Sequence, residues 1–301
     1  MNDHNIIQNS YDLSSPTGGQ GALVECPRDA MQGWKTFIPT EKKVEYINAL
    51  LQVGFDTIDF GSFVSPKAIP QMADTKEVVK QLNVQHSKSK LLAIVANKRG
   101  AEEAVVYDEI SYLGFPFSLS PTFQLRNTNS TMEQSFETVK YIQELCIKHG
   151  KQLVVYLSMG FGNPYGDAYD DSILLLWADN MAQLQIPIIS LADTVGLATP
   201  EQISYALRTI IPQHPNITFG VHLHSTAVNW KAKIDAAYTA GCRRFDGALK
   251  GIGGCPMAND ELVGNMATEW MIDYFKERNI LPPLNEAALQ HCLQLANEIF
   301  V

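Results

Sequence analysis

The sequence has few of the features that mark several protein classes. It has no basic run, and its 32 Asp and Glu outnumber its 23 Lys and Arg to give a net charge of −9. Neither nucleic acid nor an anionic membrane surface is therefore an expected partner. No apolar stretch is long enough to span a bilayer. The five cysteines are scattered and odd in number, which argues against a disulfide scaffold and favours a reducing cytoplasm.

The chain also lacks a Gly/Ser- or Pro-rich linker, and no G-x-G-x-x-G motif follows its first apolar run. Short apolar runs alternate with amphipathic helical stretches instead. The runs expected to form strands are 22–26, 56–60, 91–96, 109–115, 152–158, 186–192, 218–224 and 243–249. Continuous apolar runs are typical of parallel strands covered on both faces. Eight β-α repeats in about 250 residues predict a single (β/α)8 TIM barrel, in preference to a doubly wound open sheet.

We expect residues 22–301 to form this one catalytic barrel, with 284–300 as an extra C-terminal helix packed outside it. Residues 1–21 are expected to be a flexible polar leader. This leader has neither a secretory apolar segment nor an arginine-rich organellar helix. The expected location is the cytoplasm.

Polar side chains follow the ends of several expected strands, where TIM barrels place their chemistry. These residues are Arg28, Asp29, Asp59, Asp193, His222, His224, Cys255 and Asn265. The two histidines form an H-x-H pair, so in a strand both imidazoles face the same side. They could share one divalent cation, or they could be two satisfied polar residues at a strand end.

Five segments resemble, in order and spacing, the motifs of the 3-hydroxy-3-methylglutaryl-CoA (HMG-CoA) lyase family. They are VECPRDAMQ, SFVSPKAIPQMAD, SLADTVGLATP, VHLHST and GIGGCPMA followed by GN, and they extend from about residue 22 to about residue 275. The family belongs to a superfamily of metal-dependent TIM barrels that make or break carbon–carbon bonds by Claisen-type chemistry. The resemblance implies retro-Claisen cleavage of HMG-CoA to acetoacetate and acetyl-CoA, in leucine degradation.

The resemblance also implies a metal site. Its ligands would be Asp29, His222, His224 and Asn265. Carboxylate, imidazole and amide ligands suit Mg²⁺ or Mn²⁺ better than a thiolate zinc site.

Roles in the reaction follow from the same resemblance. Arg28 would stabilise the enolate oxygen, and Cys255 would protonate the acetyl-CoA carbanion. The general base stays open between Asp29 and His222. The residues expected to orient these groups or to contact the substrate are Asp59, Asp193, Gln32 and Lys35, while Lys67 is a further candidate for a CoA phosphate.

Simpler roles stay open for several of these residues at this point. Arg28 could form an ordinary salt bridge, and Asn265 could cap the helix that follows it. Asp59 and Asp193 could bond to loop amides, and the lysines could be solvated surface charges.

The sequence departs from the usual lyase pattern at several positions. Asp59 replaces the usual Glu, and the other departures are Ala30, Gly33, Trp34, Val154 in place of an arginine, Asn163 in place of a cysteine, and Ser225. The acyl-CoA substrate is therefore less firmly implied than metal-assisted cleavage. The alternatives are a synthase that condenses acetyl-CoA with a 2-oxo acid and a non-catalytic barrel that binds metal and acyl-CoA. The oligomeric state is open, with a homodimer among the options.

Overall fold

A computed structural model describes residues 21–254 and 263–301. Its strands are β1 (Ala22–Glu25), β2 (Thr57–Ser62), β3 (Lys90–Ile94), β4 (Ile110–Ser118), β5 (Gln152–Ser158), β6 (Ile188–Asp193), β7 (Thr218–Leu223) and β8 (Arg244–Gly247). They form one closed barrel in chain order, and β1 pairs in parallel with both β2 and β8. The predicted TIM barrel is confirmed. Residues 1–20 of the predicted leader lie outside the described residues, so the leader stays a prediction.

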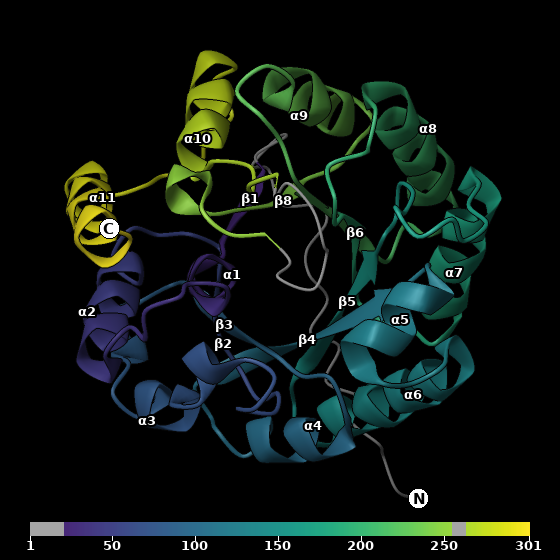
Figure 1. Cartoon of the computed structure of the whole chain (residues 1–301). Helices are drawn as coiled ribbons and strands as arrows, with labels where there is room; N and C mark the ends of the chain where they lie inside the picture. The colour runs from purple at the N-terminus through teal and green to yellow at the C-terminus, as the bar shows by residue number, and fades with distance from the viewer. Residues whose placement is uncertain (1–20, 255–262) are drawn as a thin grey trace, which may run out of the picture.

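A ring of helices surrounds the strands (Figure 1). The helices are α1 (Pro27–Gln32), α2 (Thr40–Leu50), α3 (Thr75–Val79), α4 (Lys98–Ala104), α5 (Pro121–Thr128), α6 (Met132–Lys148), α7 (Asp171–Gln183), α8 (Pro200–Ile210), α9 (Trp230–Thr239), α10 (Thr268–Glu277) and α11 (Glu286–Ile299). The last of them, α11, lies outside the barrel beside α2 (Figure 1), so the predicted extra C-terminal helix is also confirmed.

The start signals in the sequence explain two of the long helices. α6 begins with a capping box of Thr131 and Gln134, and α8 with one of Thr199 and Gln202. In each box the threonine hydroxyl accepts from the backbone N–H three residues on, while the glutamine side chain accepts from the threonine N–H. Local chemistry therefore fixes where these helices begin.

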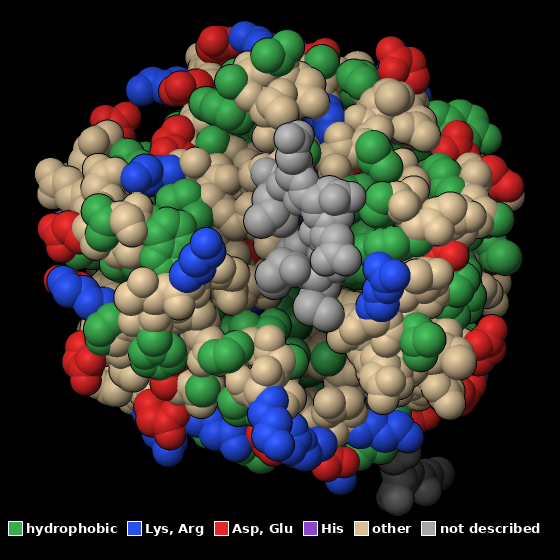
Figure 2. Space-filling view, viewed as in Figure 1, with side chains coloured by type: hydrophobic (Ala, Val, Ile, Leu, Met, Phe, Trp, Pro, Cys, Tyr) green, Lys and Arg blue, Asp and Glu red, His purple; other side chains and the backbone are tan. Residues whose placement is uncertain are grey.

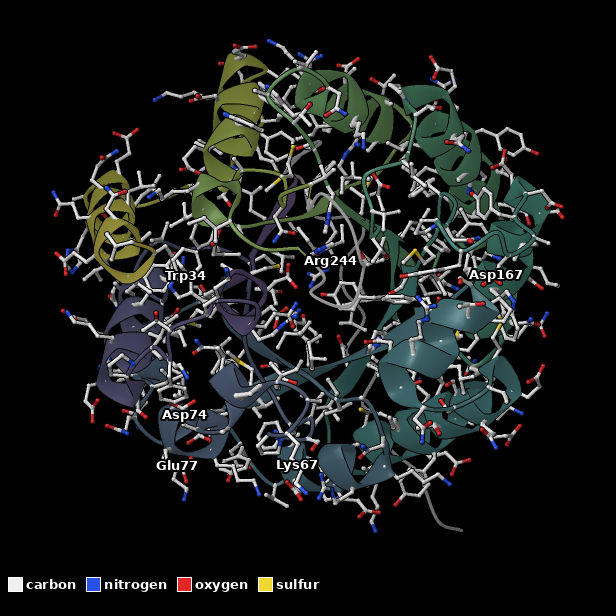
Figure 3. All side chains as sticks on the ribbon, in the orientation of Figure 1. Trp34, Lys67, Asp74, Glu77, Asp167 and Arg244 are labelled. Atoms are coloured by element: carbon white, nitrogen blue, oxygen red, sulfur yellow. The ribbon has the colours of Figure 1, made fainter. Side chains whose placement is uncertain are left out.

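The barrel interior is divided into two halves that differ in polarity. One half, which we call the apolar half, comes from β3–β6 and consists of Leu92, Ile94, Tyr112, Val154, Tyr156 and Ile188. The other, the charged half, comes from β2, β7 and β8 and consists of Asp59, His222, Arg244 and Asp246. Arg244 lies within the ring of helices (Figure 3) and donates from Nη1 to Asp56 (3.0 Å) and Thr57 (3.2 Å).

Viewed down the barrel axis, the surface carries acidic and basic side chains interspersed around its rim (Figure 2). No helix in residues 21–254 and 263–301 is long and apolar enough to cross a membrane.

Candidate metal and active site

The two histidines of the H-x-H pair lie at the carboxyl end of β7. His222 is in the strand and His224 follows it, with their ring centroids 5.5 Å apart. Because side chains alternate along a strand, the two-residue spacing brings both rings to one face. The ring of Tyr156 meets His222 edge-on with centroids 6.0 Å apart, which places this face inside the barrel.

Asp29 reaches the same point from near the start of the chain. It lies in the first turn of α1, which follows β1 almost at once and holds the carboxylate at the barrel mouth. One ligand atom from each of Asp29, His222 and His224 lies within 4.8 Å of the others. The structure therefore brings together three of the residues predicted as metal ligands.

Asn265 lies beside them because the segment after β8 returns to the end of β7. Asn265 forms an isolated antiparallel bridge with His224. Its Nδ2 donates to Asp29 Oδ2 (2.6 Å) and to the Ile252 carbonyl (3.0 Å). Its Oδ1 is buried and accepts no hydrogen bond from the part of the chain that the structure describes. The cap of α10 is Ala267, so the helix-cap role is excluded for Asn265.

Gly253 makes this close approach sterically possible. A Cβ on Gly253 would lie 2.6 Å from Asn265 Nδ2 and 2.8 Å from the Asp29 carbonyl oxygen, and its φ is +109°. Contacts this short and a positive φ both exclude an ordinary side chain. A glycine at position 253 is therefore required by packing at the site.

These donors fit a divalent cation. Two imidazole nitrogens, a carboxylate oxygen and a buried amide oxygen without a partner are ligands for Mg²⁺, Mn²⁺ or a similar ion. Burial and the neighbouring His222 lower the pKa of His224 to about 4, which keeps its imidazole neutral and able to bind metal. Burial acts to lower the pKa of His222 as well, but the hydrogen bond and charge of Asp246, together with the charge of Asp29, outweigh burial and raise the pKa overall.

Arg28 joins the carboxylates at the mouth into one network. Its Nη1 donates to Asp29 Oδ1 (2.9 Å), and its Nε donates to both oxygens of Asp59 (3.2 and 3.1 Å). Gln32 accepts from Arg28 Nη1 (2.9 Å) and donates to Asp29 Oδ1 (2.6 Å). Asp59 and Gln32, both predicted as supporting residues, are thus placed beside Asp29.

The two carboxylates of this network differ in pKa. Burial raises the pKa of Asp59 and outweighs the attraction of Arg28. Burial acts in the same direction on Asp29, but the charges of Arg28 and His222 and the hydrogen bond from Asn265 lower its pKa overall. The lowered pKa of Asp29 favours its charged form, as a metal ligand requires.

Asp193 acts on the site through a buried lysine. Its Oδ2 accepts from Lys233 Nζ (2.6 Å) and its Oδ1 from the Ala198 amide (3.0 Å). Lys233 Nζ also donates to the His224 carbonyl (2.8 Å). Asp193 thus fixes the backbone at His224 by way of Lys233, a residue that the sequence analysis missed.

Three other candidates are not placed at this cluster. Lys35 and Lys67 are exposed, and Lys67 lies among the outer elements in Figure 3. Cys255 lies outside the described residues.

The departures from the lyase pattern have local explanations. Ala30 is buried in α1, and Trp34 packs edge-on against Phe300 with ring centroids 5.3 Å apart. Ser225 contacts Met266 through its hydroxyl (3.4 Å to Sδ). Each of these residues fills a local packing role.

Val154 belongs to the apolar half, where the resemblance leads one to expect an arginine. The barrel interior instead holds Arg244, which enters from β8 and lies 5.7 Å from the ring centroid of Tyr112. An arginine is therefore present in the interior, but on a different strand.

The cluster opens into a cavity of about 420 Å³. It is lined by Arg28, Asp29, Gln32, Val64, Ser65, Ala68, Ile69, Ile94, Ala96, Asn97, Pro116, Phe123, Arg126, Asn127, Thr128, Asn129, Tyr156, Ser158, Ala192, Thr194, His222 and His224. Its polar end is the metal-ligand cluster, and apolar side chains from β3–β5 supply the facing wall. A cavity of this size suits a small acyl group.

The sequence analysis missed α5, which supplies part of this lining. Its start is marked by Ser120 at the N-cap and by proline in the first turn, a signal that could have revealed it. Asp167 fixes that start by accepting from the Thr122 amide (2.9 Å) and hydroxyl (2.8 Å). Asn163 orders the Asp167 loop in turn, because its Oδ1 accepts from the Asp167 N–H (3.1 Å).

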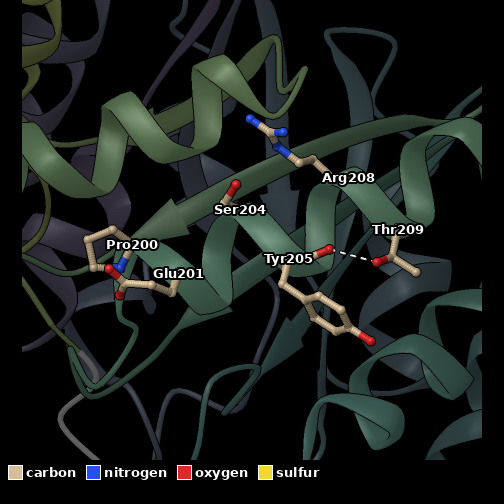
Figure 4. A pocket seen from close by; sticks show the side chains of 6 residues that line it. All are labelled: Pro200, Glu201, Ser204, Tyr205, Arg208 and Thr209. Atoms are coloured by element: carbon tan, nitrogen blue, oxygen red, sulfur yellow. Dashed lines mark hydrogen bonds between the residues drawn. The ribbon is translucent and has the colours of Figure 1, made fainter.

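A second hollow, of about 490 Å³, lies along α8 (Figure 4). It is lined by Pro200, Glu201, Ser204, Tyr205, Arg208 and Thr209. All six belong to one helix of the outer ring, so this hollow is separate from the strand ends and contributes nothing to the metal-ligand cluster.

The chain is similar to proteins of one family along almost its whole length. The family model described as HMGL-like matches residues 24–296. A hydroxymethylglutaryl-CoA lyase of Bacillus subtilis is 31% identical over 254 residues, which cover 84% of each chain. An (R)-citramalyl-CoA lyase of Chloroflexus aurantiacus is 29% identical over 87% of this chain and 85% of its own.

A solved structure shows the same fold. It is an HMG-CoA lyase of Acinetobacter baumannii in complex with coenzyme A and 3-methylmalate, with 32% identity and a TM-score of 0.86. The match covers 93% of this chain and 91% of the other.

Proposed function

Because the chain belongs to the HMGL-like family of carbon–carbon lyases, we propose that it cleaves a 3-hydroxyacyl-CoA by a metal-dependent retro-Claisen reaction. The proposed substrate is HMG-CoA, and the products are acetoacetate and acetyl-CoA. The observation that carries this proposal is the meeting of Asp29, His222 and His224 within 4.8 Å beside the unpartnered Asn265 Oδ1.

The proposed cation is Mg²⁺ or Mn²⁺, held by Asp29, His222, His224 and Asn265. When bound, such a cation lowers the pKa of the substrate hydroxyl and orients it. Asp29 and His222 are the two groups proposed to accept the hydroxyl proton. As that proton leaves, the bond breaks between the hydroxyl-bearing carbon and the carbon next to the thioester carbonyl. The electron pair of that bond moves toward the thioester oxygen and leaves the enolate of acetyl-CoA.

Arg28 is proposed to stabilise the negative charge on that oxygen. Its guanidinium is buried and charged, and Asp59 holds it through two hydrogen bonds to Nε (3.2 and 3.1 Å). A fixed cationic donor in a buried site stabilises developing charge without reorganising. Gln32 is proposed to hold both Arg28 and Asp29 in this arrangement.

Cys255 is proposed as the acid that protonates the carbon of the leaving acetyl-CoA. Gly253, which approaches Asp29 and Asn265 closely, lies two residues before it in the chain. A thiol is a suitable acid because its pKa responds strongly to nearby charge.

Citramalyl-CoA is the second candidate substrate. One relative is named for this activity, and Val154 occupies the position where the HMG-CoA lyase pattern has an arginine. HMG-CoA and citramalyl-CoA would bind at the same site. They differ in the acyl group that the apolar half of the interior would have to accommodate.

The test is a direct assay of the purified protein with Mg²⁺ or Mn²⁺. HMG-CoA, citramalyl-CoA, and acetyl-CoA mixed with a 2-oxo acid are supplied separately, and product formation is measured. We expect metal-dependent release of a keto acid and acetyl-CoA from at least one hydroxyacyl-CoA, and its loss with a chelator. Condensation without cleavage would show a synthase, and CoA binding without turnover would show a non-catalytic barrel.

A further inference from the structure

A second group of ligand-type side chains lies next to the candidate metal cluster. Cys26 follows β1, His222 lies on β7 and Asp246 on β8, and one ligand atom from each lies within 4.8 Å of the others. Strand register explains the grouping, because Asp246 pairs with His222 on one side and with Val24 on the other. The two clusters therefore share His222.

The bonding capacity of these groups is largely unused. Asp246 Oδ1 is buried and has no hydrogen-bond partner among the described residues, although its Oδ2 lies 3.4 Å from His222 Nδ1. Within residues 21–254 and 263–301, Cys26 Sγ makes a single long hydrogen bond, 3.9 Å, to the Val24 carbonyl. Buried polar atoms are nearly always satisfied, so an unpartnered carboxylate oxygen beside a thiol and an imidazole points to a missing ligand.

The charge around Cys26 favours a cation as that ligand. Burial above all, and then the charges of Asp246, Asp59 and Asp29, raise the pKa of the Cys26 thiol, while Arg28 acts to lower it. Arg244 is the other buried cation that acts on Asp246. Cys26 and Asp246 are 1% and 2% exposed, so water screens this negative field poorly.

We propose that Cys26, His222 and Asp246 bind a soft divalent cation, Zn²⁺ foremost, at a second site that shares His222 with the one formed by Asp29, His222, His224 and Asn265. Thiolate, imidazole and carboxylate are zinc ligands, and three protein ligands leave one position open. Binding replaces the S–H bond of Cys26 with a sulfur–metal bond and releases the proton to solvent. Magnesium does not favour a thiolate, so the two sites differ in selectivity.

Sharing His222 couples the two sites, and this consequence rests on the proposed function. Zinc held by Cys26 and Asp246 withdraws His222 from the cation that supports cleavage. We expect zinc to weaken Mn²⁺ binding and to inhibit turnover. A thiol in this position would make the enzyme sensitive to thiophilic metals.

The site is tested with Co²⁺ and Zn²⁺ on the full-length protein. A cobalt–thiolate bond gives a charge-transfer absorption in the near ultraviolet, so we expect one such band per chain on Co²⁺ addition. Cys26→Ser should abolish the band and weaken Zn²⁺ binding about 100-fold or more. Losing a residue that only hydrogen-bonds to a metal ligand costs about 10–100-fold in affinity, and losing a ligand itself should cost at least the upper end of that range. Cys242→Ser is the matched control and should keep the band, because Cys242 is equally buried and lies just before β8.

Two further variants separate this proposal from the others. Cys255→Ser should keep the cobalt–thiolate band, because Cys255 is not a ligand of the proposed second site. Asp29→Asn should also keep the band, but it should lose Mn²⁺ binding at the first site. If the wild-type protein gives no band, the proposal is overturned. It is also overturned if the band survives Cys26→Ser and disappears in Cys255→Ser. Cys26→Ala, with circular dichroism as the folding check, repeats the test if the serine variant misfolds. Failure to cleave any acyl-CoA would refute the proposed function but leave the absorption test unaffected.

Discussion

The charged and apolar halves of the barrel interior do different work. In the charged half, His222 and Asp246 are neighbours on adjacent strands and Asp59 holds Arg28. In the apolar half, Val154 and Ile188 are neighbours in the same kind of parallel pairing, with no charge between them. The same parallel strand pairing thus places charged side chains on one side of the interior and apolar side chains on the other. In the proposed function, the charged half would act on the reacting end of the acyl-CoA and the apolar half would pack against its acyl group.

The largest expected effect comes from removing one charge beside the charged half. Asp29→Asn keeps the shape of the side chain but loses the carboxylate charge, so we expect the cleavage rate to fall about 10³-fold or more. This exceeds the loss of about 10–100-fold that follows removal of a residue that only hydrogen-bonds to a metal ligand. Mn²⁺ affinity, measured by calorimetry, should fall with it. Asp273→Asn, an exposed substitution on α10, is the control and should change neither quantity. Equal loss in both variants would contradict the assignment of Asp29.

Arg28→Lys tests the fixed geometry of the guanidinium. Lysine keeps the positive charge but cannot bond Asp29 and Asp59 together through one planar group. We expect kcat to fall about 10²–10³-fold, as when one oxyanion donor is lost, with little change in Mn²⁺ affinity. A fall in metal affinity with an unchanged kcat would show that Arg28 only supports the ligand Asp29.

Glu25 is a buried acid on the face of β1 that points away from the barrel interior, and it makes the stability of the fold depend on pH. Glu25 faces the helices, where Leu249 N–H and the Thr268 hydroxyl donate to it, and burial raises its pKa to about 8. The folded chain therefore holds a proton that the unfolded chain has released, and stability from this residue falls as pH rises through about 8.

Glu25→Gln should remove this dependence. Between about pH 5.5 and about pH 7.5, the wild-type free energy of unfolding should fall relative to the variant by up to about 1.4 kcal/mol per pH unit. Urea unfolding at each pH measures the difference. Parallel pH profiles for the two proteins would mean that Glu25 is charged in the folded state.

The smallest effect is expected in the apolar half. Ile188→Val removes one buried methylene and should lower the free energy of unfolding by about 0.5–1.5 kcal/mol. Mn²⁺ affinity should stay unchanged, because Ile188 belongs to the wall and not to the ligand cluster. A measurable loss of metal affinity would show that the two halves are energetically coupled and would break the comparison.

Much of the fold could be predicted because it depends on local pattern. All eight strands were expected from their apolar runs, and the H-x-H spacing alone placed two imidazoles on one face. The short α5 was missed because its pattern is brief and polar. Asn265 could be proposed only through the family resemblance, since its place beside Asp29 depends on a bridge to His224.

The residues that sequence reasoning missed are those whose role comes from pairing between distant strands. Asp246 becomes important only because it pairs with His222 and Val24. Lys233 was not singled out in the sequence, although it is 1% exposed and bonded to Asp193. No periodicity within one segment carries this information.

The sequence by itself determined the barrel, the starts of α6 and α8 and the shared face of the two imidazoles, because hydrophobic period and capping act between residues a few positions apart. The tertiary structure alone decided which carboxylate faces which imidazole, which lysine is buried, and which thiol lies beside His222. Those contacts arise when the sheet closes and brings β8 beside β1, and closure is a property of the whole chain that no single stretch encodes.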